Sequence, residues 1–91
     1  MFKTLEELIA IIRQRKEPPA DKSYTSKLLI NKKLSVEKVK EEVAELIDSI
    51  EKNSNKVHEA ADVLYHLMVL LEANGIKIED VMDELKKRQK K

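Results

Sequence analysis

The chain has 91 residues, enough for one compact domain, which we expect to span residues 1–91. Its 18 Lys and Arg against 17 Asp and Glu give a net charge of +1, which excludes a global field for nucleic acid, and its lack of cysteine excludes disulfides and thiolate metal sites. Because Gly occurs once and Pro twice in a chain rich in Leu, Ile, Lys and Glu, the composition favours helices and disfavours a β-rich fold.

The first predicted helix follows a capping box, Thr4-Leu5-Glu6-Glu7, in which Thr4 is the N-cap. Apolar residues then recur at helical spacing as far as Ile12. Pro18-Pro19 ends this helix at or before Glu17, because the residue before a proline is restricted to extended conformations. The segment is charged and amphipathic, so it does not resemble a signal sequence.

The next elements are a short helix and a long one. A polar loop over residues 18–22 leads to a short helix over residues 24–30, which Ser23 can cap. Ser35 is the next plausible N-cap, for a third helix that closes at Asn53. One apolar stripe with a period of 3.6 runs along this helix. It consists of Val36, Val39, Val43, Leu46, Ile47 and Ile50.

The fourth helix starts after Asn55, runs to Ala73 and ends at Asn74-Gly75, which is a left-handed C-terminal signal. It is apolar on nearly every side, as expected of a buried helix. Its longest apolar run, Leu67 to Leu71, is too short to span a bilayer, so we expect no membrane partner and a cytoplasmic location. A last helix begins near Ile78, and the short connections favour an all-α bundle of four to five helices.

The apolar surface of the fourth helix also predicts self-association. Apolar residues on more than one of its faces exceed what four short neighbours can cover in a 91-residue monomer. We therefore expect the bundle to be completed by dimerisation, although the sequence does not decide between a dimer and a tetramer.

Acidic residues on the third and fourth helices suggest a metal site. Glu59, Asp62 and His66 occupy positions i, i+3 and i+7 of the apolar fourth helix, so they share one face. Carboxylates in an apolar interior are costly unless they are paired, protonated or bound to a metal. Two antiparallel helices could turn Glu42 and Glu45 towards this face, and four such oxygen ligands suit Mg²⁺ or Mn²⁺.

Both acidic sets also have an interpretation without metal. Glu41, Glu42 and Glu45 alone would usually form a solvated helix face, paired with Lys38 or Lys40. The helical angle places Glu41 nearly opposite the apolar stripe. The carboxylates of the fourth helix could simply pair with each other in the core. Taken together, the two acidic pairs favour a metal.

The spacing of these residues resembles a known family. Glu42-x-x-Glu45 followed by Glu59-x-x-Asp62 resembles the ExxE…ExxD signature of the MazG-type all-α nucleotide pyrophosphohydrolases. Within that group, residues 59–67, EAADVLYHL, resemble the phosphoribosyl-ATP pyrophosphohydrolases of histidine biosynthesis. Further matching segments are SYTSKLL at residues 23–29, the paired Glu41-Glu42, and GI-x-x-EDV at residues 75–81. One departure is Lys40, which stands where this family usually has Gly.

The resemblance implies hydrolysis of phosphoribosyl-ATP to phosphoribosyl-AMP and pyrophosphate by a stand-alone homodimer. It implies Mg²⁺ as the cofactor, with Mn²⁺ as a substitute, held by Glu42, Glu45, Glu59 and Asp62. The implied catalytic carboxylates are Glu41, Glu42 and Glu45, without a decision on which one activates water. The substrate-binding candidates are Ser23, Thr25, Lys27, Lys38, Tyr65 and His66. Each also has a plainer role, as a surface lysine, a helix cap, a packing residue or, for His66, a support of the site.

Two other functions remain open. A MazG-type house-cleaning enzyme that acts on an ordinary or damaged nucleoside triphosphate would share the fold and the metal site. A helical interaction module without catalysis, acting through the basic residues 86–91, would need neither. No aromatic residues interleave these basic residues, so a solvated terminus is the plainer interpretation.

Overall fold

The computed structural model describes residues 2–16 and 23–89, and over these ranges the chain forms five helices and no strand. In chain order they are α1 (Lys3–Lys16), α2 (Tyr24–Ile30), α3 (Lys32–Lys52), α4 (Lys56–Ala73) and α5 (Ile78–Arg88). The all-α prediction is confirmed. Within the described ranges, every helix is too short or too polar to cross a bilayer. The predicted stop at Pro18-Pro19, the loop over residues 18–22 and the last two residues of the basic end lie outside these ranges.

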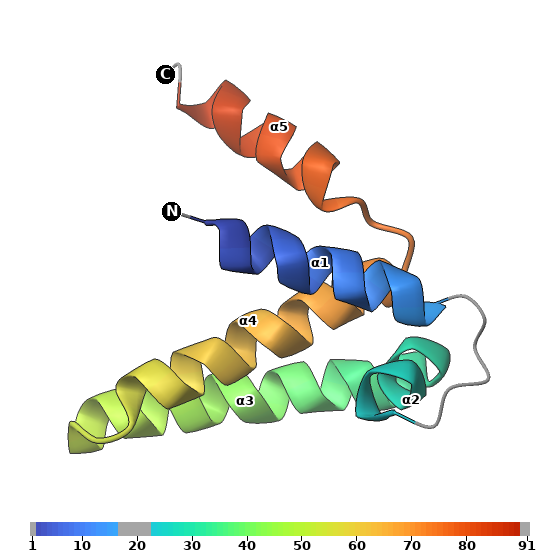
Figure 1. Ribbon diagram of the computed structural model, residues 1–91. Coiled ribbons are helices and arrows are strands. Elements are labelled where there is room, and N and C mark those ends of the chain that lie inside the picture. The colour runs from blue at the N-terminus through green and yellow to red at the C-terminus, as the bar shows by residue number, and fades with distance from the viewer. Residues whose placement is uncertain (1, 17–22, 90–91) are drawn as a thin grey trace.

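Helix α4 is the centre of the fold. It contacts α1, α2, α3 and α5, and its most extensive contact is with α3. Figure 1 shows α3 and α4 side by side as an antiparallel hairpin, with α2 at the end of α3 that is remote from the hairpin turn. In the same view α1 crosses over α4, and α5 leads away from the end of α4. The hairpin therefore brings the two predicted acidic segments onto neighbouring helices.

The hydrophobic core lies where α1, α2 and α4 meet. Its buried apolar residues are Ile12, Leu28, Leu29, Met68, Val69 and Ala73. Among the described residues of α3, the buried ones are polar or charged, namely Ser35, Glu42 and Ser49. Thus α3 turns a polar face inwards rather than its apolar stripe.

The apolar stripe of α3 is largely exposed. Val36, Val43, Ile47 and Ile50 all retain more than a third of their accessible surface. The physical reason is that the face of α3 towards α4 carries the small and acidic side chains, which leaves the stripe pointing outwards. Completion of the bundle by a second copy stays a prediction.

The predicted starts of α1 and α3 were wrong. Helix α1 begins at Lys3 rather than after Thr4, because the amide of Glu6 donates to the carbonyl of Phe2 at 3.1 Å. Helix α3 starts at Lys32, so Ser35 lies inside it. Its N-cap is Asn31, whose side-chain oxygen accepts from the amide of Leu34 at 3.0 Å. A residue that caps equally well thus precedes Ser35 in the chain.

Other predicted helix ends are confirmed. Ser23 caps α2 by accepting from the amide of Ser26. Helix α4 runs from Lys56 to Ala73 as expected, and Gly75 after it has a φ of 70°. Asn55 precedes α4 in a left-handed conformation, but its side chain makes no capping hydrogen bond.

An ion-pair hub connects α1, α4 and α5. The Nε of Arg13 in α1 donates to Glu72 of α4 at 3.2 Å. Its two terminal nitrogens donate to the carboxylate of Glu79 in α5 at 3.0 and 2.7 Å. Lys16 adds a hydrogen bond to the carbonyl of Glu72 at 2.9 Å. Since α5 buries no residue completely, this bidentate pair is a principal link between α5 and α1.

Candidate functional site

The α3–α4 hairpin carries two clusters of ionisable side chains. On α3, ligand atoms from Glu41, Glu42 and Glu45 all lie within 4.8 Å of one another. On α4, ligand atoms from His58, Glu59 and Asp62 satisfy the same limit. The predicted metal ligands are therefore grouped on each helix, and helical spacing explains the grouping.

The two clusters share one electrostatic field. The pKa of Glu42 is raised by its burial and then by the nearby carboxylates of Glu45 on its own helix and Asp62 on α4. The pKa of Glu59 is raised by partial burial and then by Glu45 of α3 and by Asp62. Each cluster thus raises the pKa of a carboxyl group on the other helix. The carboxylates of α3 and α4 are therefore electrostatically linked, and a common site formed by both helices stays a prediction.

Glu42 is the most informative member of the site. Only 9% of the residue is exposed, and its Oε2 has no hydrogen-bond partner among the described residues. A buried carboxylate oxygen without a partner is costly. A hard divalent cation is the kind of ligand that such oxygens prefer, so this donor set fits Mg²⁺ or Mn²⁺.

One member of these clusters was predicted at an unfavourable helical angle, and another was not predicted at all. Glu41 was placed almost opposite the apolar stripe, but its carboxylate lies with those of Glu42 and Glu45, because this part of α3 turns acidic residues rather than the stripe towards α4. His58 was not predicted at all, and its Nε2 lies 3.4 Å from Oδ2 of Asp62. The i, i+4 spacing of the two residues was a signal that could have identified it.

The predicted substrate-binding residues divide into three places. Thr25, Tyr65 and His66 meet where α2 packs on α4, and the hydroxyls of Thr25 and Tyr65 are hydrogen-bonded to each other. Lys38 lies beside the acidic clusters, with its Nζ 3.4 Å from Oε2 of Glu41. Ser23 caps α2, and Lys27 is exposed in the last turn of that helix.

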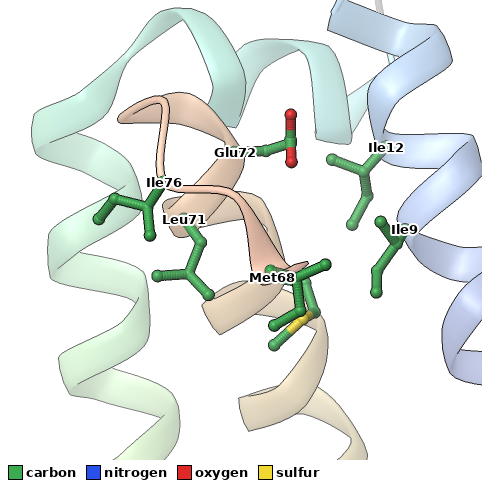
Figure 2. Close-up of a pocket in the computed structure, with 7 residues that line it drawn as sticks. Ile9, Ile12, Met68, Leu71, Glu72 and Ile76 are labelled. Carbon is green, nitrogen blue, oxygen red and sulfur yellow. The ribbon is translucent and has the colours of Figure 1, made fainter. Parts of the chain in front are cut away.

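An open groove runs along the hairpin near its turn. It has a volume of about 570 Å³, and its acidic lining includes Glu41, Glu45 and Glu59. A second cavity, between α1 and the end of α4, is lined mainly by apolar side chains such as Ile9, Met68 and Leu71 (Figure 2) and has a volume of about 10 Å³. That space holds about one water molecule at most, so it cannot accept a nucleotide, whereas the groove is large enough to do so.

The comparisons with known proteins agree with this geometry. Residues 5–89 match a family model described as phosphoribosyl-ATP pyrophosphohydrolase. A phosphoribosyl-ATP pyrophosphatase of Methanoculleus marisnigri is 43% identical over 91 residues, and the match covers 94% of each chain. A second relative of that name, from Pyrobaculum arsenaticum, is 42% identical over 94 residues, which cover 97% of each chain.

Longer relatives also match. The histidine biosynthesis bifunctional protein HisIE of Pyrococcus furiosus is 45% identical over 87 residues. That match covers 94% of this chain but only 41% of the relative. The chain therefore spans less than half of this bifunctional relative, but nearly all of the two pyrophosphatases above.

Proposed function

This chain belongs to the phosphoribosyl-ATP pyrophosphohydrolase family, and we propose that it hydrolyses phosphoribosyl-ATP to phosphoribosyl-AMP and pyrophosphate in histidine biosynthesis. The observation that carries the proposal is the buried Oε2 of Glu42, without a partner in the described structure, amid carboxylates from α3 and α4. The proposal includes a single nucleotide pyrophosphohydrolase domain over residues 1–91 and a cytoplasmic location.

In this proposal Glu42, Glu45, Glu59 and Asp62 hold Mg²⁺, for which Mn²⁺ can substitute. Bound there, the ion supplies charge neutralisation for the phosphate oxygens and lowers the pKa of a coordinated water. The effect of Glu45 on the pKa of Glu59, which lies on the neighbouring helix, supports a site formed by both helices. The excess negative charge of the cluster is what a divalent cation would compensate.

The remaining carboxylate and its lysine have separate roles. Glu41 is exposed beside Glu42 and Glu45, where its oxygens can accept a proton from the attacking water. The neighbouring Glu41 raises the pKa of Lys38, so this ammonium group stays charged. Lys38 can therefore exchange Glu41 for a phosphate oxygen of the substrate. The catalytic carboxylates of the proposal are Glu41, Glu42 and Glu45.

The test is an assay of pyrophosphate release from phosphoribosyl-ATP, with Mg²⁺ and with a chelator. We expect release by the wild-type protein with Mg²⁺ and its loss in Glu45→Gln and Asp62→Asn. A matched control is Glu51→Gln, which removes one exposed carboxylate from the same α3 helix and should retain activity. Wild-type turnover in both site variants, with their helical circular dichroism intact, would refute the proposed site.

The same preparation separates the two alternative functions. A house-cleaning enzyme would turn over a panel of deoxynucleoside triphosphates faster than phosphoribosyl-ATP. An interaction module would show no rise in melting temperature with Mg²⁺ or Mn²⁺, whereas an ion that binds the folded state must raise it.

We also propose that the active form is a homodimer. The α3 stripe leaves Val43, Ile47 and Ile50 exposed, and Val57 and Leu64 of α4 are exposed as well. Exposed apolar surface of this extent on a 91-residue chain favours burial against a second copy. The stripe belongs to the same helix as Glu42 and Glu45, so self-association would cover the outer face of the helix that carries the site.

A further inference from the structure

Aromatic and hydroxyl side chains pack and form hydrogen bonds where the first turn of α2 meets α4. The hydroxyl of Tyr24 lies 2.8 Å from Nε2 of His66. The rings of Tyr24 and Tyr65 stack with a centroid distance of 6.3 Å and an angle of 19°. The His66 ring meets both tyrosines edge-on, at 5.7 and 5.0 Å. His66 is only 6% exposed, so its ring is fixed by these neighbours.

The hydrogen bonds of His66 indicate which of its ring nitrogens donates a proton and which accepts one. Its Nδ1 lies 2.8 Å from the main-chain carbonyl oxygen of Asp62. A carbonyl only accepts, so Nδ1 carries the proton, and in the neutral ring Nε2 must then be an acceptor. When the ring is neutral, Tyr24 therefore donates to Nε2. Burial raises the pKa of Tyr24, which keeps its phenol protonated as this role requires.

This chain of hydrogen bonds ends at a residue of the proposed metal site. The carbonyl that His66 holds belongs to Asp62, whose carboxylate lies in the α4 cluster. Both ring nitrogens of His66 are engaged, so the neutral ring has no free lone pair for a metal ion.

We propose that Tyr24 and His66 are positioning residues: the Tyr24 hydroxyl holds His66, and His66 holds the turn of α4 that presents Asp62 to the cation. This inference rests on the proposed function, because it assigns the two residues a role in metal affinity. It differs from a substrate-binding role for His66, which would require the ring to contact the nucleotide. Tyr24 itself was not among the residues predicted from the sequence.

The first experiment removes single hydroxyls. Tyr24→Phe deletes the donor to His66, and Tyr65→Phe is the matched control, since it deletes a hydroxyl of the same cluster that bonds to Thr25 instead. Mn²⁺ affinity is measured without substrate, from the paramagnetic resonance of the free ion. We expect about a 10-fold loss in Tyr24→Phe, typical for residues that orient metal ligands, and less than about a twofold change in Tyr65→Phe.

Two further readouts separate positioning from substrate binding. In ¹⁵N-labelled protein, the His66 ring should show the neutral form protonated at Nδ1, and its Nε2 resonance should move in Tyr24→Phe. In the assay with phosphoribosyl-ATP at saturating Mn²⁺, Tyr24→Phe should leave KM unchanged. A raised KM with wild-type Mn²⁺ affinity would assign Tyr24 to the substrate and overturn the inference.

A second pair of variants decides the matter if Tyr24→Phe does not fold. His66→Asn keeps an amide donor near the position of Nδ1, whereas His66→Leu keeps a similar volume without a donor. We expect His66→Asn to bind Mn²⁺ about 10-fold more tightly than His66→Leu, and equal affinities would refute the role of His66. If the wild-type protein itself binds no Mn²⁺, the proposed function fails, and that result is distinguishable from the loss of positioning in a variant.

Discussion

Replacement of Glu42 by Gln should make the metal-free protein more stable and less active. The carboxylate of Glu42 is nearly buried, and its Oε2 lacks a partner among the described residues. A buried polar group in this state costs about 1–3 kcal/mol, and more when it is charged. Gln keeps the shape, removes the repulsion from Glu45 and Asp62 and supplies an amide donor to these carboxylates, so we expect a gain of about 1–3 kcal/mol at neutral pH in the presence of a chelator.

The predicted gain has a measurable size. In a domain of this length, 1 kcal/mol shifts the melting temperature by about 4–8 °C, so the variant should melt on the order of 5–20 °C higher. The gain should shrink at acid pH. Because burial and neighbouring carboxylates raise the pKa of Glu42, the charge that destabilises the folded state disappears as the pH falls through that raised value.

Addition of metal should make the wild type more stable relative to Glu42→Gln. Excess Mg²⁺ at about 100 times its dissociation constant stabilises a folded protein by about 2.7 kcal/mol, and this stabilisation should occur in the wild type but not in Glu42→Gln. Pyrophosphate release should fall on the order of 100-fold or more. Glu51→Gln, the exposed control on α3, should change stability by less than about 0.5 kcal/mol. A metal-free Glu42→Gln protein that melts below the wild type, or one that still gains stability from Mg²⁺, would refute this account of the site.

Other predictions test the fold. Arg13 lowers the pKa of Glu79 to about 2 from 4.5, so their pair contributes fully above about pH 4.5 and is lost as the pH falls towards 2. Melting temperatures over this range should therefore fall less in Glu79→Gln than in the wild type, and parallel slopes would contradict the pair. Leu28→Ala should cost about 2–5 kcal/mol in urea unfolding, because Leu28 is 0% exposed, whereas Ile30→Ala, at a residue 64% exposed, should cost much less. Ile47→Asp, in the α3 stripe at 54% exposure, should shift the sedimenting species to a monomer, and an unchanged mass would argue against the proposed dimer.

The sequence predicted those helix ends that have a clear chemical signal. Asn74-Gly75 closes α4 where expected, because few other residues adopt a left-handed conformation easily. The starts of α1 and α3 were misplaced, since the carbonyl of Phe2 and the side chain of Asn31 accept from amides of an earlier first turn than Thr4 or Ser35 would define. Local sequence identifies residues able to cap a helix, whereas tertiary packing decides which one does.

The candidate site was predictable to the extent that it depends on helical spacing. Glu59 and Asp62 were identified because acidic residues are unusual on an apolar helix, and the structure brings Glu42 and Glu45 into the same field. The contact of Tyr24 with His66 was not predictable, because it joins residues that are far apart in the chain. The exposure of the α3 stripe was not predictable either, since periodicity defines a face without identifying what covers it.

The hydrophobic core is separate from the acidic clusters, and this separation affects how the protein tolerates amino-acid substitutions. All the buried apolar residues of the described chain come from α1, α2 and α4, while the carboxylates converge between α3 and α4. Repulsion among them acts on the spacing of the hairpin, and among the described residues of α3 only the partly buried Leu34 packs against that apolar centre. Substitutions on the acidic face of α3 should therefore disturb the apolar centre little.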